Sequence, residues 1–111
     1  MDFETFKALI NDYLKLGRSV DKLLAEYGYP PEIRLNAEDF IKALKIVAAA
    51  ADCDINALIE LSGLKTIDFA RKFVKPYSTM LKWTAKGQCP SSDAIYIGFI
   101  MVTELENVKE D

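Results

Sequence analysis

Apolar residues recur every three to four positions along most of the chain, and each run ends at a capping residue, a glycine or a proline. This period places the apolar side chains on one face of an α-helix, and no alternating strand pattern occurs before residue 90. The chain is therefore predicted to be all-α, with five to seven helices. The first four helices are expected between Asp2 and Gly17, between Ser19 and Gly28, from Asn36 to Ala51 and from Ile55 to Ser62.

Two boundaries in the first half follow from residues that stop helices. The Tyr29-Pro30-Pro31 stretch cannot continue a helix, because proline lacks the N–H group and fixes φ, so residues 28–35 are predicted to be a linker. Two aspartates flank Cys53, and the second, Asp54, has a side chain that can cap a new helix. The alternative is one continuous helix over residues 37–62, because alanine-rich sequence propagates a helix well.

The segment AIYIGFIMV, residues 94–102, also has the composition of a β-strand, because it is rich in β-branched and aromatic residues. We predict a helix, since Ser91 can cap it and a lone strand would leave its backbone without hydrogen-bonding partners. This helix is apolar nearly all round, so one face can pack within the chain while a second needs cover. Either residues 1–50 or a second copy of the chain would supply that cover.

Residues 64–84 form two short amphipathic units joined by Val74 and Lys75. The apolar faces of the units consist of Phe69, Ala70 and Phe73, and of Met80 and Trp83. Pro76 opens the second unit in its first turn, where a missing N–H group is harmless. Because Ala70 is small, a second helix can cross the first closely. Two short helices with a tight turn at this spacing predict a helix-turn-helix.

Charge is distributed unevenly along the chain, whose net charge is −3. Residues 65–90 carry six basic side chains and one acidic side chain, whereas the segments before and after them are acidic. The basic side chains of this segment are Lys65, Arg71, Lys72, Lys75, Lys82 and Lys86. A local basic island suits a polyanion, because neutralisation of phosphates drives the binding of nucleic acids. The alternative is an ordinary solvated helix face.

The sequence SGLKTIDFARKFVKPYSTMLKWTAKGQCP, residues 62–90, resembles the Cro/C1 or Xre type of helix-turn-helix DNA-binding domain. The resemblance covers about residues 54–105 and implies a lambda-repressor-like helical bundle. Two positions depart from the family, which has a glycine where Val74 stands and an apolar residue where Lys75 stands. Because the glycine takes a positive φ, either the turn is rearranged here or Val74 points inward in place of Lys75.

The resemblance also implies a binding surface. The helix from Tyr77 to Thr84 would lie in the major groove, with its first residues at the base edges. Tyr77, Ser78 and Lys82 would then face the bases, with Thr79 contributing from the same edge. Lys65, Thr66 and Lys86 would hold phosphates, although Thr66 is shorter than the glutamine-like residue that the family has there. Tyr77 could instead pack at the helix start, and Ser78 could instead cap it.

The sequence shows no motif for catalysis, metal binding or cofactor binding. The chain has no histidine, which removes the commonest general base and the commonest metal ligand. Its two cysteines, Cys53 and Cys89, have neither the spacing of a zinc site nor that of a disulfide framework, and we interpret them as reduced thiols. Phosphate-binding and dinucleotide-binding glycine motifs are absent. We therefore expect neither an enzyme nor a cofactor or metal.

The longest uncharged apolar run is far shorter than the roughly 20 residues that cross a bilayer, and no basic stretch precedes an apolar one at the start. We expect a cytoplasmic protein that does not contact membranes. It would comprise a helical extension over residues 1–50 with two to three helices, a helix-turn-helix domain over residues 54–105 and an acidic tail over residues 106–111.

Two functions from different classes remain. The first is a sequence-specific regulator of transcription, of prokaryotic or phage type, that binds double-stranded DNA as a homodimer. Residues 1–50 would provide either dimerisation or contacts with an effector protein. The second is a protein-interaction module on a helix-turn-helix scaffold. The second gains support from the acidic ends of the chain and from the lack of arginine, glutamine and asparagine in residues 77–84, because base readout depends on those side chains.

Overall fold

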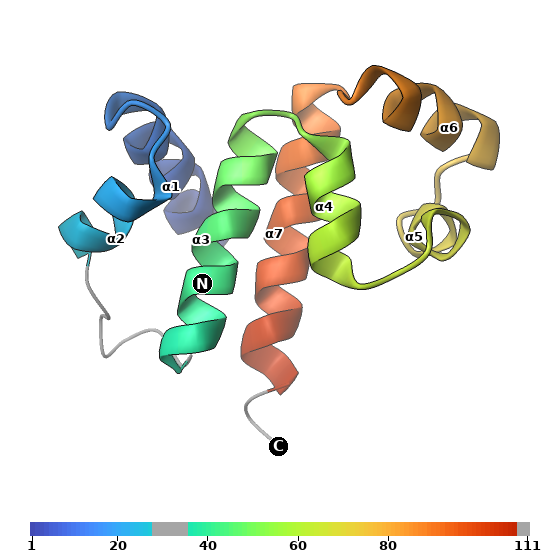
Figure 1. Ribbon diagram of the computed structural model, residues 1–111. Coiled ribbons are helices and arrows are strands. Elements are labelled where there is room, and N and C mark those ends of the chain that lie inside the picture. The colour runs from blue at the N-terminus through green and yellow to red at the C-terminus, as the bar shows by residue number, and fades with distance from the viewer. Residues whose placement is uncertain (28–35, 109–111) are drawn as a thin grey trace.

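The computed structural model describes residues 1–27 and 36–108 (Figure 1). In these residues the chain forms seven α-helices and no strand, which confirms the all-α prediction. The helices are α1 (Phe3–Lys15), α2 (Val20–Tyr27), α3 (Ala37–Ala51), α4 (Ile55–Ser62), α5 (Thr66–Lys72), α6 (Tyr77–Lys86) and α7 (Ser91–Val108). The predicted linker, residues 28–35, lies outside the described residues, as do residues 109–111 of the predicted tail. Residues 106–108 belong to α7.

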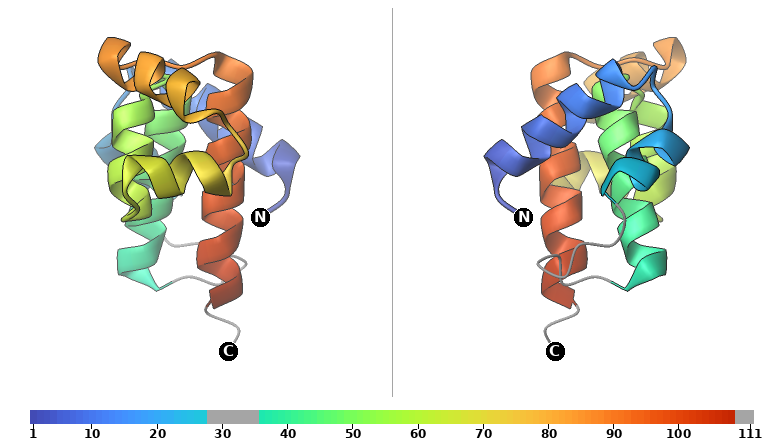
Figure 2. Two further views of the ribbon diagram at one scale, coloured as in Figure 1. Left: turned by 90° about the vertical axis from the view of Figure 1, so that its right-hand side faces the viewer. Right: turned by 90° about the vertical axis from the view of Figure 1, so that its left-hand side faces the viewer.

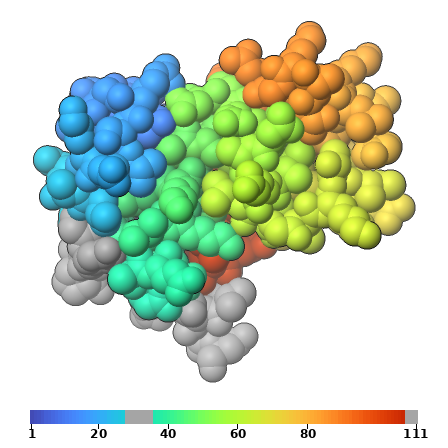
Figure 3. Space-filling model, viewed as in Figure 1, coloured from blue at the N-terminus to red at the C-terminus, as the bar shows by residue number. Residues whose placement is uncertain are grey.

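Helices α3, α4 and α7 form the middle of the molecule, with α1 and α2 on one flank and α5 and α6 on the other (Figure 1). The most extensive packing joins α3 to α7. In the space-filling view, the α1–α2 surface and the α5–α6 surface lie at opposite sides, separated by α3 and α4 (Figure 3). The two flanks therefore face away from each other.

One apolar core joins the parts of the chain before and after Cys53. Phe6 and Val47 from the first part are fully buried, as are Leu58 and Val102 from the second, and all four belong to a single cluster. The predicted extension and the predicted helix-turn-helix segment thus share one core, because α3 packs against both α1 and α7.

A sharp corner separates α3 from α4. Cys53 takes φ = 55°, and two hydrogen bonds close the end of α3: Cys53 N–H donates to the Ala50 carbonyl (3.2 Å) and Asp54 N–H to the Ala49 carbonyl (2.9 Å). The Asp54 carboxylate then accepts a hydrogen bond from Ala57 N–H at 3.1 Å and caps α4. The predicted break is confirmed, and the alternative of one continuous helix is wrong.

The apolar segment at residues 94–102 is part of α7, so the helix prediction is confirmed and the strand alternative is wrong. Both of its apolar faces find cover within the chain. Ile97 and Val102 are fully buried, and the ring of Phe99 lies 5.2 Å from that of Phe3 and 6.0 Å from that of Phe6. Because α1 and α3 cover this helix, it does not itself require a second copy of the chain.

Gly98 sits where α7 packs closely against α3 and Phe6. A Cβ atom added there would lie 2.9 Å from the Cβ of Ala50 and 2.9 Å from the Phe6 ring, closer than side chains pack. The glycine thus permits an approach that any larger residue would widen. None of the helices in the described ranges is long and apolar enough to cross a membrane.

Candidate nucleic-acid interface

Helices α5 and α6 pack on each other in front of α4 and α7 in the left view of Figure 2. The apolar faces predicted for the two units are directed inward: Phe69, Ala70, Phe73 and Met80 are buried, and Trp83 is half-buried against the core. The rings of Phe69 and Phe73 are 4.8 Å apart. Pro76 lies at the N-cap of α6, one residue before the first-turn position that we expected.

The turn between the two helices has a left-handed residue that is not glycine. Val74 takes φ = 54°, its N–H donates to the Arg71 carbonyl (3.2 Å), and Lys75 N–H donates to the Ala70 carbonyl (2.9 Å). This is the pair of hydrogen bonds with which glycine commonly ends a helix. The Val74 side chain is 87% exposed. Both expectations for this turn were therefore wrong: valine adopts the positive φ itself, and it points outward.

Lys75 attaches the turn to the start of α7. Its Nζ lies 2.6 Å from Oδ1 of Asp93 and 5.8 Å from the centre of the Trp83 ring. The ion pair is half-buried, with 30% of the lysine side chain and 23% of the aspartate side chain exposed. The ammonium group of Lys75 thus lies near the Trp83 ring while the Asp93 carboxylate neutralises its charge.

The residues predicted to contact DNA lie on α6 and at the start of α5. Tyr77, Ser78, Lys82, Lys86 and Lys65 are exposed, whereas Thr66 and Thr79 are half-buried. Ser78, Lys82 and Lys86 are four residues apart, so they form one row along α6. The N-cap of α6 is Pro76 and Ser78 is the second residue of the helix, so the alternative role of Ser78 as the capping residue is wrong.

Ion pairs divide the basic island into two groups. Three of its cations face acids: Arg71 lies 4.0 Å from Asp68, Lys72 lies 2.5 Å from Glu104, and Lys75 pairs with Asp93. Within residues 1–27 and 36–108, no acidic side chain lies within ion-pair distance of the other three cations, which are Lys65, Lys82 and Lys86. These three are the lysines that the sequence assigned to DNA. Their charge therefore remains uncompensated at the surface around α5 and α6.

The surface also carries exposed apolar side chains, of which the sequence analysis missed Leu81 and Ile67. Leu81 is 46% exposed and Tyr77 45%, and the two lie one helical turn apart on α6. Val74 precedes them, and Ile67 on α5 is 38% exposed. Leu81 could have been recognised, because it falls four residues after Tyr77 and three before Thr84, off the face formed by Met80 and Trp83.

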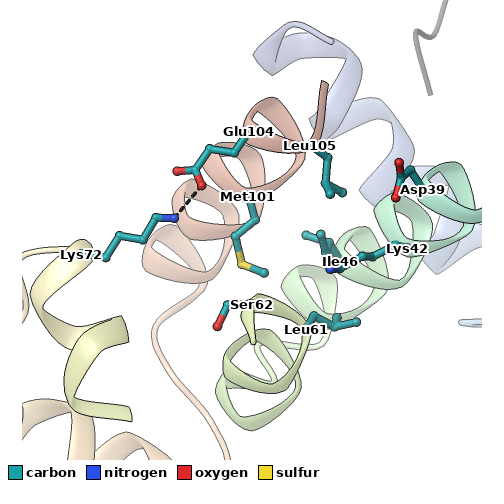
Figure 4. A pocket seen from close by; sticks show the side chains of 9 residues that line it. All are labelled: Asp39, Lys42, Ile46, Leu61, Ser62, Lys72, Met101, Glu104 and Leu105. Atoms are coloured by element: carbon teal, nitrogen blue, oxygen red, sulfur yellow. Dashed lines mark hydrogen bonds and ion pairs between the residues drawn. The ribbon is translucent and has the colours of Figure 1, made fainter. Parts of the chain in front are cut away.

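A hollow of about 280 Å³ lies between α3, α4 and α7 (Figure 4). Apolar side chains converge on it, among them Ile46, Leu61 and Met101, and the Lys72–Glu104 ion pair closes one side. Ser62 also lines it, but its hydroxyl donates to the Ile59 carbonyl at 2.5 Å. The lining therefore holds no nucleophile with an adjacent base, and no His, Cys, Asp or Glu cluster in the described part of the chain is arranged to hold a metal ion.

The two cysteines approach each other across the fold, although 36 positions separate them in sequence. Cys89 N–H donates to the Cys53 carbonyl at 3.1 Å, and both thiols are free. Cys89 is 7% exposed, and this burial is the main cause that raises the pKa of its thiol to about 12. A thiol with so high a pKa is a poor nucleophile at neutral pH, so Cys89 has a packing role.

Comparison of this chain with protein-family models, with curated proteins and with solved structures finds no match in any of the three.

Proposed function

We propose that this chain is a sequence-specific regulator of transcription, of prokaryotic or phage type, that binds double-stranded DNA through a helix-turn-helix formed by α5 and α6. The observation that carries the proposal is the set of uncompensated lysines. Lys65, Lys82 and Lys86 lie around the exposed side of this helix pair, while the other cations of the basic island are paired with acids. A phosphate backbone would neutralise this charge, and counterion release would supply the affinity.

In this proposal α6 enters the major groove, which is wide enough for one α-helix. Tyr77 and Ser78 at its first turn, Thr79 beside them and Lys82 one turn later reach the base edges. Lys65, Thr66 and Lys86 lie at the two ends of the helix pair and hold phosphates. The exposure of five of these seven residues supports the assignment, and half-burial limits the reach of Thr66 and Thr79.

The proposed regulator acts as a homodimer on a near-palindromic site. Two copies of α6 about 34 Å apart would contact successive turns of the duplex from one side. The flank formed by α1 and α2 lies opposite α5 and α6 and stays free for an effector protein (Figure 3). Sedimentation of the protein with its selected duplex should give two chains per duplex, and one chain per duplex would contradict the dimer.

Selection from randomised duplexes at moderate salt tests the proposed DNA binding. We expect one sequence family to be enriched and the affinity to fall steeply as salt rises. Lys86→Ala should weaken binding to all duplexes and reduce the slope of log affinity against log salt concentration by about one. Ser78→Ala should instead change which sequence is preferred, because the binding free energies of different duplexes shift relative to each other by about 1–3 kcal/mol. Lys22→Ala, an exposed lysine on α2 at the far flank, is the matched control and should change neither.

A second candidate function is a protein-interaction module on the same helix pair. The exposed apolar side chains of Val74, Tyr77 and Leu81 favour it, because clustered apolar groups at a surface mark contact sites. This candidate predicts that folded protein enriches no duplex in the selection. A protein partner that loses affinity for Leu81→Ala and keeps it for Lys86→Ala would then support it.

A further inference from the structure

The exposed side of α6 carries two parallel rows of different chemistry. Ser78, Lys82 and Lys86 form a polar row with four-residue spacing, and Tyr77, Leu81 and Ala85 form an apolar row beside it. All six residues are exposed. The two rows differ by one position along the helix, so each polar side chain has an apolar neighbour.

The apolar row has no function in the core of this chain. Met80 fills the core from α6 and Trp83 packs against it, whereas Tyr77 and Leu81 are exposed and lie outside the buried core cluster. Leu81 is 46% exposed and Tyr77 45%, so much of each side chain is accessible to a ligand. The exposed part of the leucine in the middle of this helix is therefore available to a binding partner.

The residues of α6 also restrict how it can recognise bases. The helix YSTMLKWTAK contains no arginine, asparagine, glutamine or carboxylate, so the bidentate contacts that identify guanine and adenine are absent, and Lys82 is the one cation in its centre. The major groove offers one apolar group, the C5 methyl of thymine. An apolar row on a helix in that groove is complementary to this methyl group.

We infer, on the basis of the proposed function, that Leu81 and Tyr77 recognise thymine through its C5 methyl group. Leu81 packs against one thymine methyl, and the ring of Tyr77 covers a second thymine toward the start of α6. Lys82, which follows Leu81, reaches the O6 and N7 acceptors of a guanine on the adjacent step. The preferred half-site thus contains thymines next to a guanine, and specificity at the thymines depends on the methyl groups.

Replacement of single thymines by deoxyuridine in the selected duplex tests this inference, because deoxyuridine keeps every hydrogen-bonding group and lacks the methyl. At the contacted positions we expect about fourfold weaker binding per methyl. Leu81→Ala should weaken binding to the thymine duplex and abolish the difference between thymine and deoxyuridine at one position. Leu81→Met, which keeps an apolar side chain of similar size, should restore that difference.

Two controls make the test specific. Leu14→Ala removes a partly exposed leucine of α1 and Lys22→Ala an exposed lysine of α2, both on the far flank, so each should leave binding and the thymine preference unchanged. Far-UV circular dichroism of each variant verifies that it is folded.

The outcomes separate the inference from the proposed function. If a sequence is enriched and every thymine tolerates deoxyuridine without loss, DNA recognition stands and the thymine inference is overturned. If folded protein enriches no duplex, the proposed function fails and the inference fails with it. A thymine preference that Leu81→Ala leaves intact would also overturn the role assigned to Leu81.

Discussion

Val74 shows how one residue can adopt a conformation that its type disfavours. A β-branched residue at φ = 54° is strained, because its side chain crowds its own backbone in the left-handed region. The hydrogen bonds from Val74 N–H and Lys75 N–H, together with the Lys75–Asp93 ion pair, keep the turn closed despite this strain. The conformation is therefore imposed by the contacts on both sides of the residue.

Val74→Gly should raise the free energy of unfolding by about 1 kcal/mol. Glycine removes a left-handed strain of about 1–3 kcal/mol but adds backbone entropy to the unfolded chain. No packing is lost, because the valine side chain is 87% exposed. Urea unfolding of both proteins measures the change. Ala85→Gly, at an exposed position inside α6, is the control and should lower stability by about 1 kcal/mol. A loss of stability in both variants would contradict the conclusion that Val74 is strained.

Tyr13 makes stability sensitive to alkaline pH. Its hydroxyl donates to Oδ2 of Asp52 at 2.8 Å, and Arg18 pairs with the same carboxylate. Burial, followed by the hydrogen bond to Asp52, raises the pKa of Tyr13 to about 12 from an ordinary value near 10. The folded state therefore holds this proton more tightly than the unfolded state does. The resulting stability is complete below pH 10 and is lost as the pH rises toward 12.

We expect the stability difference between the natural chain and Tyr13→Phe to shrink by on the order of 2 kcal/mol between about pH 10 and 12. Below pH 10 the variant lacks the hydrogen bond to Asp52 and is the less stable protein. Urea unfolding of the two proteins across this range measures the difference. The pKa of Tyr27 is also raised to about 12, but this residue is present in both proteins, so its contribution to the pH dependence cancels in the difference. A gap that stays constant with pH would contradict the assignment.

Helix α7 illustrates what the pattern of a single element does and does not predict. Its caps and length predict a helix, and its apolar surface predicts that more than one neighbour covers it. The identity of those neighbours depends on Gly98, which lets α3 approach the middle of α7. The sequence alone offers a second copy of the chain as an equally suitable cover, because periodicity identifies an apolar face and carries no information on what lies against it.

Gly98→Ala should destabilise the fold by a net 1–2 kcal/mol or so, although alanine favours helices. The added methyl would lie 2.9 Å from Ala50 Cβ and from the Phe6 ring, and such overpacking costs about 1–3 kcal/mol. In a double variant with Ala50→Gly the methyl meets no Cβ on α3. Thermal unfolding should then show a smaller loss of stability in the double variant than the sum of the losses in the two single variants. A loss equal to that sum would show that the contact between Gly98 and Ala50 does not limit the approach of the helices.

At the scale of the whole molecule, α3 is the element on which the others assemble. It packs against α1, α2, α4 and α7, so the segment that carries the candidate interface depends on residues far before it in sequence. The molecule measures 41 × 36 × 21 Å, with the α1–α2 surface and the α5–α6 surface on opposite flanks. If the α5–α6 flank binds DNA as proposed, the α1–α2 flank stays accessible.

Because α7 packs most extensively on α3, a fragment of residues 54–108 should not fold alone. Removal of α3 would expose Ile97, Met101 and Val102, which are buried in the full chain. Circular dichroism should show no cooperative thermal transition for the fragment and a cooperative one for residues 1–108. A cooperative transition of the fragment would establish that residues 54–105 are an independent domain, as the sequence analysis expected.

The sequence by itself determined the helices, because caps, glycines and prolines act locally and the 3.6-residue period needs no partner. It also identified the basic island and seven candidate contact residues, five of which are exposed. Tertiary structure decided what depends on contacts between distant residues. It decided which lysines of the island are neutralised, since Glu104 and Asp93 lie on α7. It decided that Val74 is left-handed and exposed, that Leu81 is exposed, and that α1 and α3 cover α7, because the surroundings of a side chain depend on packing between segments that are distant in sequence.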